Sequence, residues 1–452
     1  MPQGDEEQEA FLLDAVSYDD VRSPGGEARS ASVLASTSSA QQAGISQYAG
    51  TSAEGQKAFT LQKQVSKFRS GSAPRTEKFV KLLRDPIVNL DALRELAWSG
   101  IPAQLRPICW RLLLGYVPPN RDLREGVLNR KRAEYRNLVE EYYNPILEET
   151  RIANANAGTN TSSSSSNQVV SELRQVAVDV PRTAPGVPFF HQEQIQKSLE
   201  RILFIWGMRH PASGYVQGIN DVATPFLAVF FYGELLDGRC QDEGRNGEDS
   251  QNGGKEQSSD SFSVEIDTED VVRRLNEINT LGGSSFELGE TLLRVEADAY
   301  WCLCKVLDGI QDHYTYAQPG IQKTLFRVGE LVSRVGQHVA DHLAKEHCEY
   351  MQFAFRWCNC LLLRELNFDL GIRLWDTYVS EGTKLKDFLV YVLSSFLLSW
   401  APELVKMDLE GLIMFLQRTP TQSWTEGDIE TVLSRAYMWR LSFANASSHL
   451  ST

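Results

Sequence analysis

The sequence lacks an N-terminal export signal and any hydrophobic run long enough to cross a membrane. Acids stand at Asp5, Glu6 and Glu7 where a signal peptide would carry lysines, and Pro2 stands where myristoylation requires glycine. The longest apolar stretches, 222–231 and 388–400, fall short of the roughly 20 residues that span a bilayer. The seven cysteines, an odd number, are typical of reduced thiols. We therefore expect a cytoplasmic chain with no transmembrane segment.

Basic charge is also scarce, since 45 Lys and Arg face 59 Asp and Glu, and the formal net charge is -14. A nucleic-acid-binding surface needs clustered Lys and Arg to displace phosphate counterions, so we expect no nucleic-acid partner. The phosphate loop G-x-x-x-x-G-K-[ST], the dinucleotide pattern G-x-G-x-x-G and the nucleophile motif G-x-S-x-G are absent. The chain is thus predicted to have no nucleotide site and no cofactor of its own.

What the sequence does contain is a long series of helical patterns. Apolar residues recur at spacings of three and four, and sustained alternation with a period of two is nearly absent. Because 42% of the 452 residues are hydrophobic, there is enough material for a large buried core. We predict an all-α fold. Helices are expected at about 76–84, 90–97, 106–114, 129–143, 195–206, 218–236, 288–308, 321–335, 351–363, 371–379, 388–400 and 409–416.

Composition divides the chain into one ordered domain and several low-complexity segments. Residues 1–75 have too few large apolar residues to offset chain entropy, so we predict that they are disordered. The ordered domain is expected over 76–440, with a serine-rich insertion at 153–168, an acidic insertion at 237–270 and a tail at 441–452. The acidic insertion has 11 acids and 3 bases. It is interpreted as a solvated loop; the alternative is that it steers a basic partner surface or is phosphorylated.

Two short segments place an arginine and a glutamine in unusual backbone settings. Arg182 follows Pro181, with two more prolines close behind, so this stretch is expected to be extended and to present the arginine. Gln217 lies between Gly214 and Gly218, just before an apolar helix, where a ligand can approach the backbone. A guanidinium and a carboxamide directed at one place suit phosphoryl transfer, because the first neutralises developing charge and the second orients water. Alone, such an arginine would be an ordinary surface residue.

These segments also carry a family resemblance. Val176, Asp179 and Arg182 form one pattern and Tyr215 with Gln217 a second, and the two resemble the finger motifs of the TBC domain of Rab GTPase-activating proteins. Further family motifs follow from about residue 78 to 415, and the segment 296–322 is similar to the Golgi-type (Gyp/Ypt) branch. These motifs are Gly100-Ile-Pro through Arg106 to Trp110, Gln217 to Asp221, Phe355-Arg-Trp357 with Arg364-Glu365, and Arg373 to Asp376.

The resemblance implies a GTPase activator whose partner is a Rab-family small GTPase in its GTP-bound form. Arg182 would be an arginine finger and Gln217 a glutamine finger, while GTP and magnesium would belong to the partner. The implied cellular role is vesicle trafficking, with peripheral association at Golgi membranes. The supporting residues would be Asp179 holding Arg182, Tyr215 shaping the Gln217 loop, Arg106 and Trp110 buttressing both, and Asn220 and Asp221.

Two alternatives of other classes remain open. The first is an effector or scaffold that docks on a Rab and catalyses nothing. The second is a metal-dependent hydrolase, because His338 and His342 stand at i,i+4 on one helix face. The sequence lacks the glutamate that a zinc hydrolase places next to its first histidine, so two ordinary surface histidines are the simpler interpretation and no metal site is predicted.

Overall fold

The computed structural model describes residues 73–155, 164–245 and 285–444. In these ranges the regular elements are all helices, which confirms the expected all-α fold. The disorder predicted for 1–75 falls outside the described residues, except that α3 begins at Ala73. The α-helices are α3 (Ala73–Arg84), α4 (Leu90–Trp98), α5 (Arg106–Leu113), α6 (Arg124–Leu138), α7 (Asn144–Ala155), α8 (Ser164–Asp179), α9 (Glu193–Arg209), α10 (Ile219–Arg245), α12 (Ser285–Gly309), α13 (Pro319–Val335), α14 (Gln337–Lys345), α15 (Tyr350–Asn359), α16 (Phe368–Glu381), α17 (Leu385–Leu397), α18 (Ala401–Leu404), α19 (Leu409–Gln417) and α20 (Glu426–Ala444).

Local sequence signals set the ends of the first helices. α3 ends at Arg84, two residues before Pro86, which could not continue a helix. α4 begins after Asn89, whose side-chain oxygen accepts hydrogen bonds of 3.1 Å from the backbone amides of Asp91 and Ala92. This is the N-cap arrangement in which a short polar side chain satisfies amides that have no partner inside the helix.

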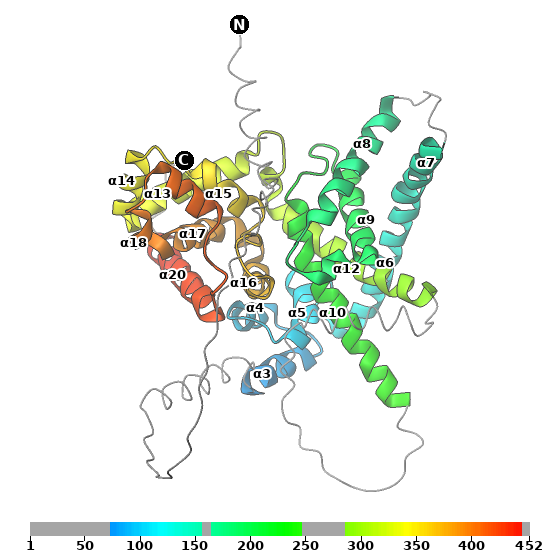
Figure 1. Cartoon of the computed structure of the whole chain (residues 1–452). Coiled ribbons are helices and arrows are strands. Elements are labelled where there is room, and N and C mark those ends of the chain that lie inside the picture. The colour runs from blue at the N-terminus through cyan, green and yellow to red at the C-terminus, as the bar shows by residue number, and fades with distance from the viewer. Residues whose placement is uncertain (1–72, 156–163, 246–284, 445–452) are drawn as a thin grey trace, which may run out of the picture. The chain divides into compact units, whose positions relative to one another are not determined.

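Two groups of helices pack around one hydrophobic core, and α16 contacts both groups (Figure 1). In the first group α12 packs on α6, α9 and α10, and α8 packs on α9. In the second group α17 packs on α13, α15 and α20. α16 touches α4, α5 and α10 as well as α17 and α20, and every residue from Leu370 to Glu381 is buried. α16 therefore joins the two groups of helices.

Several elements differ from the sequence prediction, and α20 (Glu426–Ala444) also runs into the tail that was expected over 441–452. The serine-rich insertion was expected over 153–168, but α8 already begins at Ser164 and only 156–163 lie outside the described residues. α10 continues to Arg245, nine residues into the expected acidic insertion, whose remainder lies outside the described residues. α20 was not predicted, because its apolar residues are spread around the helix and give no clear stripe.

Among the described residues, one helical stretch, Phe368–Leu404, is long and apolar enough to cross a membrane by length and composition alone. It comprises α16, α17 and α18, and Gly382 interrupts it with a left-handed φ of +56°. Within the fold, 72% of its most apolar window is buried. Burial of this degree is typical of the core helices of a folded domain, which is the role that the sequence predicted for 388–400.

Candidate functional site

The arginine segment is helical where the sequence predicted an extended chain. α8 runs through Val176 to Asp179, and a single 3₁₀ turn, η4 (Val180–Arg182), carries the arginine. Leu173, Val176 and Val180 are buried at helical spacing, so packing favours the helix up to this point. Pro181 is tolerated because the first turn of a helix does not use its missing amide. The 3₁₀ turn ends at Arg182, whose side chain is exposed.

The glutamine segment has the predicted glycine on either side, but protein side chains occupy the space beside both: Glu172 beside Gly214 and Asn359 beside Gly218. Gly214 and Gly218 have φ of +61° and +107°, values that side-chain-bearing residues rarely adopt. A Cβ atom on Gly218 would lie 2.2 Å from Nδ2 of Asn359. The glycines were expected to let a ligand approach the backbone, whereas the side chain of Asn359 fills the space beside Gly218. Gln217 itself is half-buried, and α10 begins two residues later as expected.

Hydrogen bonds join the two segments directly. The Tyr215 hydroxyl donates to Oδ2 of Asp179 at 2.9 Å. Nδ2 of Asn220 donates to Oγ1 of Thr183 at 2.9 Å, and Oδ1 of Asn220 accepts from the Gly218 amide at 2.8 Å. Tyr215, Asp179, Thr183 and Asn220 are all buried. Because buried hydrogen bonds are costly to break, the exposed Arg182 and the half-buried Gln217 are carried on one connected unit.

Asp179 acts differently from the sequence expectation, which was that it would hold the Arg182 guanidinium. Its hydrogen bond goes to Tyr215, and its interaction with Arg182 is electrostatic and lacks a contact. Burial raises the pKa of Asp179, while the Tyr215 hydroxyl and the charges of Arg182 and Arg364 oppose this rise. Burial, followed by the nearby Asp179 carboxylate, raises the pKa of Tyr215 well above its usual range. Tyr215 therefore stays a neutral donor, and Asp179 links the two segments.

Three residues that support the segments were not singled out from the sequence. Nδ2 of Asn359, at the end of α15, donates to the Gln217 carbonyl at 2.9 Å. Oε1 of Glu172, in α8, accepts from the Tyr215 amide at 2.8 Å. Thr183 follows Arg182 and anchors Asn220. For Thr183, its position next to Arg182 was a signal that could have been used. The contacts of Glu172 and Asn359 join residues 43 and 142 positions apart, so no local pattern reveals them.

Asp221, predicted as a supporting residue, is buried. Its Oδ2 accepts a contact of 3.5 Å from the Cys360 thiol. Burial raises the pKa of Asp221, and the positive charge of Arg364 opposes the rise. Arg364 thus influences both buried carboxylates near the segments, Asp179 and Asp221. The family match at this arginine had been noted in the sequence without a role.

Arg106 and Trp110 contact α16 and not the arginine segment that they were expected to buttress. Arg106 donates from Nε to Oδ1 of Asp376 at 2.9 Å and from Nη2 to Oδ2 at 3.0 Å. Nε1 of Trp110 donates to Oδ1 of the same carboxylate at 2.8 Å. Both oxygens of the fully buried Asp376 are therefore satisfied. These contacts fix α5 against α16. Trp110 also packs on Phe226 of α10, the helix that follows Gln217, with ring centroids 5.6 Å apart.

Of the histidine pair considered as a metal site, His342 contacts a backbone carbonyl. Nε2 of His342 lies 2.8 Å from the Met407 carbonyl oxygen, and His338 is exposed on the same helix. Within the described ranges, no group of three or more His, Cys, Asp or Glu side chains is arranged to hold a metal ion.

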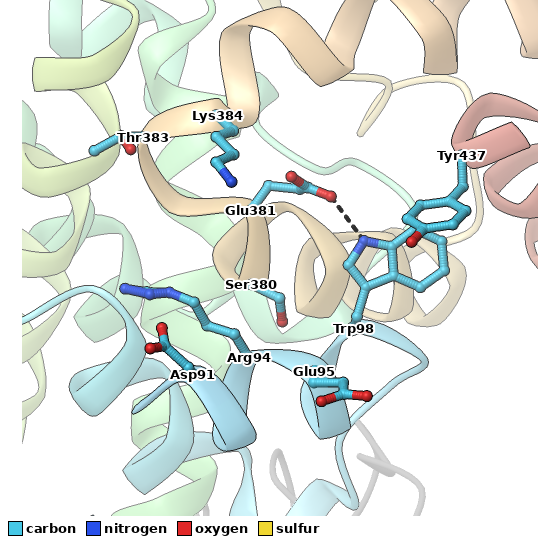
Figure 2. Close-up of a pocket in the computed structure, with 9 residues that line it drawn as sticks. All are labelled: Asp91, Arg94, Glu95, Trp98, Ser380, Glu381, Thr383, Lys384 and Tyr437. Carbon is cyan, nitrogen blue, oxygen red and sulfur yellow. Dashed lines mark hydrogen bonds between the residues drawn. The ribbon is translucent and has the colours of Figure 1, made fainter. Parts of the chain in front are cut away.

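A pocket of about 550 Å³ lies apart from the two segments, between α4, the end of α16 and α20 (Figure 2). Trp98 and Glu381 point toward each other in it, and Nε1 of Trp98 donates to Oε1 of Glu381 at 2.8 Å. Glu381 also pairs with Arg440 at 2.6 Å, so its charge is already compensated. Three acids and two bases line the pocket, a balance that does not favour a triphosphate. They are Asp91, Glu95 and Glu381, with Arg94 and Lys384.

Comparison with known proteins places these segments in a family. A family model described as the Rab-GTPase-TBC domain matches residues 103–405. The chain is 40% identical over 377 residues to the GTPase-activating protein gyp1 of Schizosaccharomyces pombe and 41% identical over 376 residues to TBC1 domain family member 22B of Homo sapiens. Each alignment covers 83% of this chain and 63% of the relative, so the chain spans slightly less than two thirds of their length.

The fold is also similar to a solved structure, the Ypt/Rab-GAP domain of Gyp1p. The TM-score is 0.66 at 36% sequence identity, over 82% of this chain and 98% of that domain. Since the family model matches more than half of the sequence and includes both the arginine and the glutamine segments, the chain belongs to the Rab-GTPase-TBC domain family.

Proposed function

We propose that this protein accelerates GTP hydrolysis by a Rab-family small GTPase, supplying two side chains to the active site of its partner. The observation that carries the proposal is that Arg182 is exposed and Gln217 half-buried on two segments joined by buried hydrogen bonds. A pure binding module would not need to fix a guanidinium and a carboxamide on one unit. The names of the relatives, which include a GTPase-activating protein, support the same activity.

The chemistry follows from the two functional groups. The Arg182 guanidinium would neutralise charge that develops on the transferred phosphoryl group, a contribution worth roughly 10³ to 10⁵ in rate for an arginine supplied in trans. The Gln217 carboxamide would orient the attacking water. GTP and magnesium would be held by the partner in its GTP-bound form. Membership of the Golgi-type branch further suggests peripheral association with Golgi membranes from the cytoplasmic side.

Single-turnover GTP hydrolysis on a panel of GTP-loaded Rab proteins tests the proposal. We expect wild-type protein to stimulate at least one of them, and Arg182→Ala to lower the maximal stimulated rate by roughly 10³. Arg174→Ala is the matched control, because Arg174 is an exposed arginine too and lies eight residues before Arg182, in α8. It should leave the rate unchanged.

Two outcomes would contradict the proposal. If Arg182→Ala kept the stimulated rate within a factor of about two, the arginine would not be a finger. If wild-type protein bound GTP-loaded Rab proteins tightly and accelerated none of them, the alternative of a non-catalytic effector or scaffold would be correct.

A further inference from the structure

Tyr316 is the most exposed of the large hydrophobic side chains in the described ranges, with 88% of its surface accessible. It lies in the turn between the 3₁₀ helix η6 (Gln311–His313) and α13. A ring left in water contributes little to folding, whereas tyrosine is enriched at the centres of protein interfaces. The Tyr316 ring is therefore available to a partner.

The backbone that follows Tyr316 is held in an unfavourable conformation. Ala317 and Gln318 have φ of +59° and +45°, although both carry a Cβ atom. Left-handed conformations of such residues persist only where the surrounding structure fixes them. Pro319, with its preset φ, then opens α13. Tyr316 thus stands on a rigid support, which reduces the entropy lost when a partner binds it.

Positive φ values of the same kind recur near the arginine and glutamine segments. Six non-glycine residues in the described part of the chain have positive φ. Ala184 lies two residues after Arg182, and Leu361 and Leu362 come shortly after Asn359, which holds the Gln217 carbonyl. Ala317 and Gln318 account for two more, and the sixth is His347. Strained backbone clusters at sites that bind or react, and the Tyr316 turn shares this feature with the arginine and glutamine segments.

Hydrogen bonds connect this turn to the glutamine segment. The Tyr314 hydroxyl donates to the Asn359 carbonyl oxygen at 2.7 Å, and Nδ2 of Asn359 donates to the Gln217 carbonyl oxygen at 2.9 Å. Tyr314 is buried, so it anchors the turn while Tyr316, two residues later, projects into solvent. These bonds tie the turn to the segment that carries Gln217, and an interface of ordinary size covers about 800 Å² on each partner.

We propose that Tyr316 is a docking residue for the GTP-bound GTPase, with its ring packed on an apolar part of the GTPase surface beside the nucleotide pocket. This inference rests on the proposed function and adds a specific contact to it. Tyr316 would strengthen association without touching the transferred phosphate. It is therefore expected to set the concentration at which stimulation is half-maximal and to leave the maximal rate unchanged.

The test measures single-turnover GTP hydrolysis by a stimulated Rab protein as a function of the concentration of this protein. For Tyr316→Ala we expect the half-maximal concentration to rise about thirtyfold, the effect of removing an interface hot spot, with the maximal rate kept within a factor of about two. Tyr316→Phe should recover most of the loss, because the ring makes the contact. Met438→Ala, which removes an exposed side chain from α20, should behave as wild type.

The possible results separate this inference from the proposed function. If wild-type protein stimulates hydrolysis and Tyr316→Ala has an unchanged half-maximal concentration, the docking role is wrong and the proposed function stands. If Tyr316→Ala lowers only the maximal rate, Tyr316 acts through the Gln217 segment and the docking role is again wrong. If wild-type protein stimulates nothing, the proposed function fails first. An unchanged thermal unfolding midpoint, together with the same result for Tyr316→Lys, excludes misfolding as the cause.

Discussion

Replacing Gly218 with alanine tests how the glutamine segment is held. The backbone at Gly218 has φ of +107°, and an added Cβ would lie 2.2 Å from Nδ2 and 2.8 Å from Cγ of Asn359. Asn359 has little freedom to yield, because it is buried and its Nδ2 already donates to the Gln217 carbonyl. The substitution must therefore strain the backbone at 218 and displace the side chain that fixes Gln217.

The magnitude follows from three contributions to the free energy of unfolding. A left-handed backbone on a residue with a Cβ costs roughly 1–2 kcal/mol. Displacing Asn359 loses a hydrogen bond worth about 1 kcal/mol. The smaller conformational freedom of unfolded alanine offsets about 0.4–1 kcal/mol. We therefore expect Gly218→Ala to lower the free energy of unfolding by about 2 kcal/mol.

A matched control isolates the contact with Asn359. Gly115 also has a positive φ, +67°, but a Cβ there would have nothing within 4 Å. Gly115→Ala therefore reports backbone strain alone, and Gly218→Ala should be less stable than it by about 1 kcal/mol in urea unfolding of the full chain. If the two variants were equally stable, the contact with Asn359 would not make alanine at 218 unfavourable.

The same variant has a functional consequence. A shift of about 1 Å in a positioned catalytic group can cost on the order of 100-fold in rate. We expect Gly218→Ala to lower the maximal stimulated GTPase rate by about that factor and to leave the half-maximal concentration near that of wild type, while Gly115→Ala keeps both. A wild-type maximal rate for Gly218→Ala would show that Gln217 is not held through this contact.

Three further predictions concern buried polar groups. Burial lowers the pKa of His313 to about 4 against the opposing charge of Asp312, with a smaller lowering by Lys386. Stability should therefore be fully present above pH 6.5 and fall by up to about 3 kcal/mol between pH 6.5 and 4, and His313→Gln should flatten this dependence in urea unfolding. Asp376→Ala should lower the free energy of unfolding by about 3–5 kcal/mol, because Arg106 is left without its carboxylate; a loss under 1 kcal/mol would contradict this. Tyr215→Phe should lower it by about 1–2 kcal/mol and reduce the maximal stimulated rate, since Asp179 loses its hydrogen bond; an unchanged rate would mean that the bond does not position the fingers.

Much of the helical architecture could be predicted from the sequence because its signals are local. Apolar spacing indicated α9, α12, α13 and α17, and Asn89 marked the start of α4. The prediction failed where local signals conflicted or were weak. Pro181 suggested an extended chain, but burial of Val176 and Val180 on one face favoured a helix through Asp179. α20 gave no clear stripe and is held by its packing on α16 and α17.

The candidate site shows the same division. The available functional groups could be identified from the amino-acid sequence, because short motifs specify the arginine, the glutamine and the glycines beside the glutamine. What each of these groups touches depends on the folded chain. Asp179 bonds Tyr215 and leaves Arg182 exposed, Asn359 holds a segment 142 positions away, and Trp110 meets Asp376 across 266 positions. Such partners depend on how helices pack, and helix packing is set by the whole core, beyond the reach of any local pattern.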